Sequence, residues 1–74
     1  MFEINGEHWK VLMVNENHPM LKRSDGSYTI GSCDDINKAI YLNENLNKQR
    51  LKRVLCHEIT HAAMFSYNVD LTID

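Results

Sequence analysis

The segment His57-Glu58-Ile59-Thr60-His61 combines two metal-binding side chains with one carboxylate. Residues four apart leave the same face of a helix with Cβ atoms roughly 5–6 Å apart, so both imidazoles can reach one zinc ion at about 2.0–2.1 Å. Glu58 lies one step round the helix, where it can border the metal and accept a proton from a metal-bound water. The spacing predicts a zinc site with His57 and His61 as ligands and Glu58 as catalytic base. The alternative is two surface histidines beside a solvated glutamate.

A helix must position these residues, and the sequence from about 47 to 66 supports one. This stretch contains no glycine or proline, and Asn45 or Asn47 can cap its start while Asn68 can take a left-handed turn at its end. Apolar residues recur at helical spacing, namely Leu51, Leu55, Ile59, Ala62 and Ala63. The pattern predicts a helix of about 20 residues.

The first half of the chain reads as short strands separated by turns. Asn5-Gly6 between two apolar runs is a strong hairpin signal, and Ser24-Asp25-Gly26-Ser27 indicates a second turn. Residues 28–30 favour a strand, residues 33–38 a loop, and residues 39–42 a final strand. We therefore predict an α+β fold: a small antiparallel or mixed sheet of three to four short strands within residues 2–42, followed by the metal-site helix. Residues 1–74 then form one small zincin-like domain, with a tail from 67 to 74.

Composition narrows the class of protein. The 74 residues are 43% hydrophobic, which argues against disorder, and their net charge of -2 gives no electrostatic reason to expect nucleic acid or a membrane as partner. No apolar leader or long apolar run is present, so we expect a cytoplasmic protein with reduced thiols. Cys56 is interpreted as a packed core thiol, and a Cys33–Cys56 disulfide is the alternative. The basic residues of the first helical turns are interpreted as a solvated face, and Trp9 as a core residue.

Residues 28–31, 39–42 and 51–62, the last containing the His-Glu-x-x-His motif, resemble the ImmA/IrrE-type metallopeptidases. These are small cytoplasmic zincins common in phages and other mobile elements. The resemblance implies a zinc-dependent endopeptidase that acts on a peptide or protein, with His57 and His61 as ligands and Glu58 as base. It also implies that the strand before the helix, around residues 38–42, lies beside an extended substrate.

Such families take a third metal ligand from beyond the helix, and here only Asp70 and Asp74 remain as carboxylates. Tyr67 stands where a metzincin would place its third ligand; it is interpreted as a core or rim residue, with an oxyanion donor as the alternative. The chain ends on a helix-start signal, which suggests either a fragment or a minimal protein. With two confident ligands, we expect weak zinc binding, poor peptidase activity and self-association through exposed apolar surface near Met64 and Phe65. The alternative functions are a zinc-binding regulatory or structural module without turnover, and a plain interaction domain.

Overall fold

The Asn5-Gly6 pair forms the tight turn that its sequence predicts. Both residues have positive φ, 49° and 82°, the conformation that a two-residue hairpin of the favoured twist requires. The turn joins strand β1 (Phe2–Ile4) to strand β2 (Glu7–Val14), which pair antiparallel. The structure, a computed structural model, describes residues 1–68.

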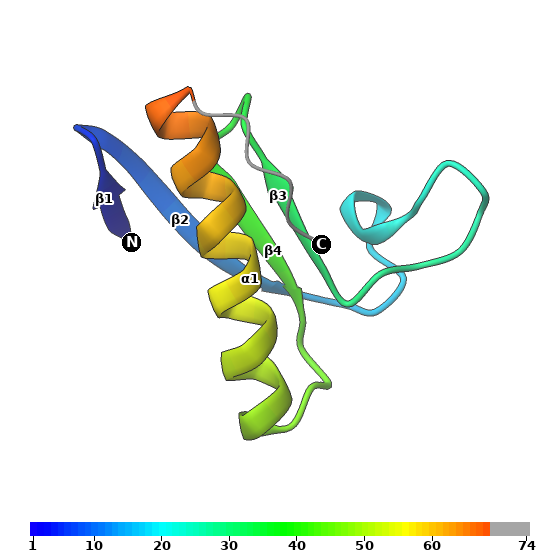
Figure 1. Cartoon of the computed structure of the whole chain (residues 1–74). Coiled ribbons are helices and arrows are strands. Elements are labelled where there is room, and N and C mark those ends of the chain that lie inside the picture. The colour runs from blue at the N-terminus through cyan, green and yellow to red at the C-terminus, as the bar shows by residue number, and fades with distance from the viewer. Residues whose placement is uncertain (69–74) are drawn as a thin grey trace.

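Two further strands complete one mixed sheet. Strand β3 (Gly31–Asp34) pairs antiparallel with β4 (Ala39–Asn43), and β4 pairs in parallel with β2. The order across the sheet is β1-β2-β4-β3, so β4 lies in the interior and β3 at an edge (Figure 1). The predicted α+β class, a small sheet followed by one helix, is confirmed.

The position of β3 differs from the prediction. Residues 28–30, expected as a strand, contribute only an isolated bridge between Tyr28 and Lys22, and β3 begins at Gly31. Cys33 and Asp34, expected in a loop, belong to the strand. The strand ends where the Asp34 carboxylate accepts hydrogen bonds from the backbone N–H groups of Ile36 and Asn37, at 3.0 and 3.3 Å. Because this side-chain turn begins at Asp34, strand pairing continues up to that residue and stops there. The loop therefore starts later than the composition suggested.

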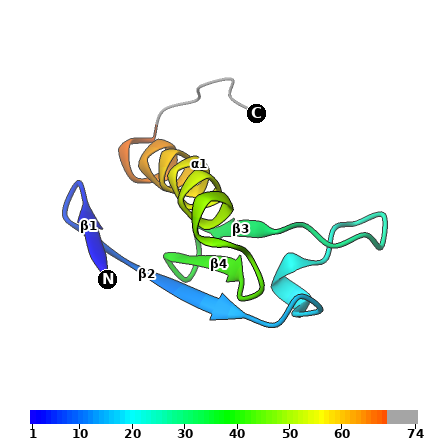
Figure 2. The same ribbon diagram turned by 90° about the horizontal axis from the view of Figure 1, so that it is seen from below.

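Residues 15–30 form an arm that projects from the sheet away from the helix (Figures 1 and 2). The arm contains a short 3-10 helix, η1 (Pro19–Leu21), whose first turn is capped by the side chain of His18. Leu21 is fully buried, and the His18 ring stacks on Tyr41 of β4 with centroids 5.5 Å apart. These contacts hold the base of the arm against the sheet.

Helix α1 (Lys48–Tyr67) lies across one face of the sheet (Figure 2). Asn47 caps its start by accepting a hydrogen bond from the N–H of Arg50 at 2.8 Å, and Asn68 ends it in the left-handed conformation at φ 53°. Both caps confirm the sequence-based prediction. Among residues 1–68 no helix combines the length and apolarity that a membrane span needs.

The core lies between α1 and the sheet. Trp9 of β2, Ile40 and Leu42 of β4 and Ala62 of α1 are fully or almost fully buried, which confirms Trp9 as a core residue. Partly buried apolar residues surround them on both layers, including Leu51, Val54, Leu55 and Ile59 of the helix. Packing of this apolar face fixes which side of α1 meets the sheet.

The two cysteines are both free. Cys33 is half-buried in β3, but Cys56 is exposed, so its interpretation as a packed core thiol is wrong. Leu55 and Ile59 take the sheet side of the helix, and a step of about 100° turns Cys56 toward solvent.

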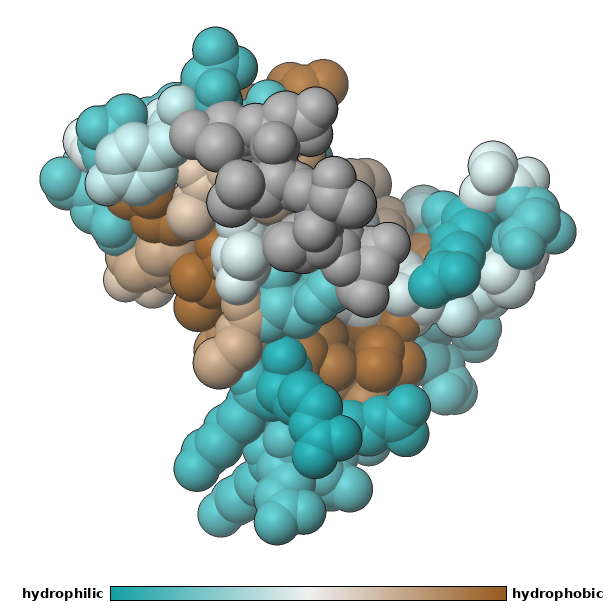
Figure 3. All heavy atoms as spheres, viewed as in Figure 1, coloured by the Kyte–Doolittle hydropathy of each residue, from teal (hydrophilic) through white to brown (hydrophobic). Residues whose placement is uncertain are grey.

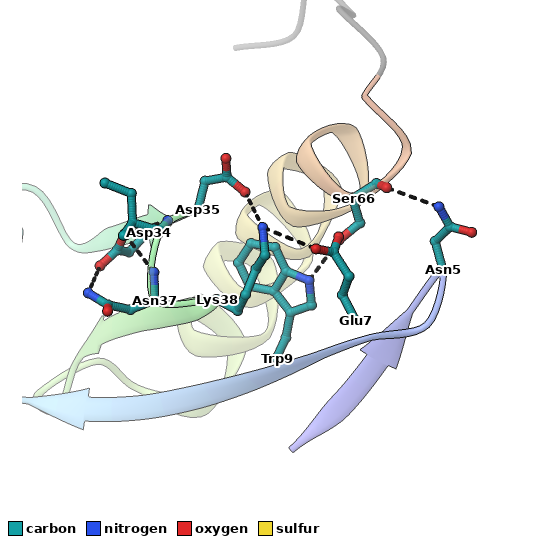
Figure 4. Close-up of polar contacts among 9 residues, drawn as sticks. Asn5, Glu7, Trp9, Asp34, Asp35, Asn37, Lys38 and Ser66 are labelled. Carbon is teal, nitrogen blue, oxygen red and sulfur yellow. Dashed lines mark hydrogen bonds and ion pairs between the residues drawn. The ribbon is translucent and has the colours of Figure 1, made fainter.

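A cluster of polar contacts ties the C-terminal end of α1 to the first hairpin (Figure 4). The indole N–H of Trp9 donates to the Ser66 hydroxyl at 2.8 Å, and the Asn5 side-chain amide donates to the Ser66 carbonyl at 3.0 Å. Lys38 lies 5.5 Å from the centre of the Trp9 ring and forms ion pairs with Asp35 and Glu7. These contacts fix the rotation of the helix about its axis, and hence the direction in which its polar side chains point.

Candidate metal centre

His57 and His61 lie side by side along α1. Their Nε2 atoms are 3.1 Å apart, and their rings meet edge to face with centroids 4.7 Å apart. Two nitrogens bound to one tetrahedral zinc ion at about 2.0–2.1 Å stand about 3.3 Å from each other. Because His57 is exposed and His61 half-exposed, an ion can reach both rings from solvent. The two rings therefore fit zinc in donor type and in separation.

Glu58 points from the same turn toward the sheet rather than toward solvent. It is only 8% exposed, while the other charged residues of the helix lie on its exposed sides. Burial raises the pKa of the Glu58 carboxyl above its usual value, and the nearby imidazoles of His61 and His57 partly oppose that rise. A carboxylate with a raised pKa is a stronger base, which suits a group that must accept a proton.

Gly31, the first residue of β3, makes room for this carboxylate. A Cβ atom at Gly31 would lie 2.6 Å from Val54 Cγ1 and 3.3 Å from both Cγ and Oε2 of Glu58. The first distance is far inside van der Waals contact. Helix and strand therefore approach each other as closely as they do because residue 31 has no side chain.

Substitution of Gly31 by Ala is expected to destabilise the chain and to displace Glu58. Overpacking of this kind typically costs about 1–3 kcal/mol in the free energy of unfolding, which urea denaturation would measure. The double variant Gly31→Ala/Val54→Ala lacks the side-chain atom that makes the 2.6 Å clash. Gly31→Ala should therefore lower the free energy of unfolding less in the Val54→Ala background than in the wild type. A Gly31→Ala variant as stable as the wild type would contradict this account of the close approach.

Cys33 lies near this site, but its thiol is unreactive. Burial, with the charges of Glu58 and Asp35 in addition, raises the pKa of the Cys33 thiol to about 12. The thiolate is the form that binds metals and attacks carbonyls, so Cys33 stays protonated and inert at neutral pH.

A third protein ligand is not found in the described part of the chain. Within residues 1–68, no group of three or more His, Cys, Asp or Glu side chains is placed to hold a metal ion. The two carboxylates that the sequence offered, Asp70 and Asp74, lie outside the described residues. Tyr67, at the end of α1, is 56% exposed, so it is not a core residue.

A pocket opens beside the histidine pair, with a volume of about 470 Å³. Figure 3 shows apolar surface between α1 and the projecting arm, with hydrophilic residues around it. The pocket is lined by residues from the arm, from the start of β3 and from α1, which are Arg23, Thr29, Ile30, Gly31, Arg53, Val54, His57 and Glu58. The sequence analysis missed the first six. Helical spacing could have found Arg53 and Val54, because they precede His57 and Glu58 by four residues and so share their faces.

The strand next to this pocket is β3, not the strand expected from the resemblance. Residues 38–42 were expected beside a substrate, but β4 pairs with a strand on each side, so its backbone has no free edge. Strand β3 lies at an edge of the described sheet and pairs only with β4. Its first residue, Gly31, lines the pocket. The position of a substrate beside residues 38–42 stays a prediction, while the insertion of β4 between β2 and β3 leaves β4 no unpaired backbone edge.

A helix that presents His-Glu-x-x-His, with the histidines on one face, is the arrangement of zinc-dependent proteases. The chain belongs to the family described as "Predicted Zn-dependent protease (DUF2268)", whose model matches residues 1–71. The match supports the broad prediction of a zinc protease family; it does not single out the ImmA/IrrE type. Comparisons with curated proteins and with solved structures gave no match.

Proposed function

We propose that this chain is the catalytic part of a zinc-dependent endopeptidase, with His57 and His61 as metal ligands and Glu58 as general base. One observation carries the proposal: two imidazole nitrogens 3.1 Å apart stand next to a buried carboxylate at the edge of a pocket. The family match supports the same reaction class. The finer relationship to the ImmA/IrrE type stays part of the proposal.

The chain's own residues would have the following roles in the reaction. Zinc held by His57 and His61 would supply Lewis-acid chemistry, which activates water and polarises a carbonyl. Glu58 accepts the proton of the attacking water and later passes it to the leaving amine. Its burial strengthens it as a base, and Gly31, which has no side chain, leaves room for the carboxylate between helix and strand.

The free edge of β3 offers a place for the substrate backbone. An extended peptide can add to such an edge through main-chain hydrogen bonds, with alternate side chains entering pockets. Gly31 belongs both to β3 and to the pocket lining, so a peptide on this edge would pass close to Glu58. We propose a peptide or protein as the partner, and neither nucleic acid nor a membrane.

Two questions from the sequence stay open as proposals. Catalytic zinc sites normally have three protein ligands, and Asp70 and Asp74 are the candidates for the third in this chain. The alternative function is a zinc-binding module without turnover, which would follow if neither aspartate ligates the metal. Self-association also stays a proposal; Phe65, which was expected to promote it, is 45% exposed.

Metal removal tests the function directly. The chain, supplied with excess zinc because we expect weak binding, should cleave an unfolded protein slowly, and mass spectrometry of the products should locate internal cuts. A zinc chelator should stop cleavage, and added zinc should restore it. Cleavage that continues in metal-stripped protein would refute the proposal. Stoichiometric zinc without any cleavage would support the module without turnover.

A further inference from the structure

The pocket beside Glu58 is flanked by two arginines that come from different parts of the fold. Arg23 belongs to the projecting arm, and Arg53 to α1, one helical turn before His57. Between them the lining includes the apolar side chains of Ile30 and Val54. The pocket lining therefore combines apolar side chains with two basic residues, and Figure 3 shows apolar surface with hydrophilic residues around it.

Neither guanidinium is neutralised within residues 1–68. The ion pairs in this part of the chain involve Lys38 and His8, and the side chain of Arg23 makes only one hydrogen bond, from Nη2 to the Thr29 hydroxyl at 3.4 Å. The one carboxyl among the lining residues is Glu58, which is buried against Gly31. The pocket thus combines two positive charges with a single carboxyl.

Such a lining selects the chemistry of its occupant. An aspartate or glutamate side chain has a short apolar stem for Ile30 and Val54 and a carboxylate that matches the planar, multidentate guanidinium group. A pocket of about 470 Å³ is ample for one such side chain. A lysine or arginine side chain would meet repulsion from both arginines.

We propose that this pocket is a specificity site that binds an acidic side chain of the substrate, next to the bond that is cleaved. The inference rests on the proposed peptidase function and adds the substrate class, peptides with glutamate or aspartate at the position that enters the pocket. Arg23 and Arg53 are the specificity-determining residues. They hold the carboxylate, and they take no part in proton transfer.

Paired peptides that differ only in Glu against Gln at one position, scanned along the sequence, test the preference. At one position the Glu peptide should have the higher kcat/KM by about tenfold, since charge-assisted hydrogen bonds are strong but these arginines are exposed. The double variant Arg23→Gln/Arg53→Gln should reduce the ratio to about one. Lys52→Gln removes an exposed positive charge from the same helix outside the pocket, and should keep the preference. Added salt should weaken it.

A binding measurement separates this proposal from the peptidase proposal. N-acetyl-glutamate amide and its glutamine counterpart are added to the metal-free chain, and backbone amide shifts are followed by NMR. The acidic compound should perturb residues 29–31 and 53–58 more strongly, and the double arginine variant should lose the difference. Preferential binding without cleavage of any peptide would overturn the peptidase function and keep the pocket. Equal cleavage of Glu and Gln peptides, or a preference that survives in the double variant, would overturn the pocket and keep the function.

Discussion

Replacement of Glu58 by Gln is expected to abolish measurable peptide cleavage while zinc binding is kept. A positioned general base typically contributes about 10²–10⁴-fold to the rate, and glutamine cannot accept the proton. Neither metal-binding nitrogen is altered, since both belong to His57 and His61.

The same substitution should not unfold the chain. The folded-state pKa of Glu58 is raised by burial, so the ionised carboxylate costs folding free energy at pH values above that pKa. Glutamine has the same shape and no charge, so at neutral pH the variant should be as stable as the wild type or more stable. Loss of activity would then report chemistry rather than misfolding.

Three measurements on one preparation check this result: cleavage rate, zinc per chain and thermal midpoint. Glu44→Gln, which changes an exposed carboxylate just before the helix, is the matched control and should leave all three unchanged. If Glu58→Gln cleaves at the wild-type rate, Glu58 is not the base. If it loses zinc as well, the carboxylate contributes to the metal site directly.

Substitution of His57 by Ala is expected to remove zinc binding. Only His61 would remain of the pair whose Nε2 atoms lie 3.1 Å apart. A single imidazole is not enough to hold a zinc ion. The loss should exceed the roughly 10–100-fold that removal of an outer-shell partner costs a metal site. His61→Ala should behave in the same way.

Zinc titration by calorimetry would measure this loss, and thermal unfolding would check it independently. Zinc should raise the thermal midpoint of the wild type, because it binds the folded chain, and should not raise that of His57→Ala. His8→Ala, an exposed histidine on β2, is the control and should titrate like the wild type. Zinc binding of equal affinity in His57→Ala would place the metal elsewhere.

The elements fixed by local chemistry could be predicted from the sequence. The hairpin follows from Asn5-Gly6, because few other residue pairs accept two positive φ angles. The helix follows from its apolar spacing and from the Asn47 and Asn68 caps. The pairing of His57 with His61 follows from helical geometry alone, because residues four apart are neighbours in any helix.

Features that depend on tertiary packing could not be predicted in this way. The limits of β3 depend on its pairing with β4 and on the Asp34 turn, and the exposure of Cys56 depends on which helix face meets the sheet. The pocket joins residues from the arm, β3 and α1 that are distant in sequence. The role of Gly31 is visible only when the helix lies on top of it.

The parallel pairing of β2 with β4 determines the order in which the chain can fold. The two strands are separated by residues 15–38, so the centre of the sheet closes only after a long loop is formed, and such non-local pairing is slow. Helix α1 packs on Trp9 from one of these strands and on Ile40 and Leu42 from the other, so it has no complete surface to dock on before that closure. His57 and His61 are neighbours on the helix even in isolation, whereas Glu58 reaches its buried place beside Gly31 only after docking. A chain in which β2 and β4 have not yet paired can therefore form the helix with His57 and His61 as neighbours, but Glu58 is not yet in its buried position.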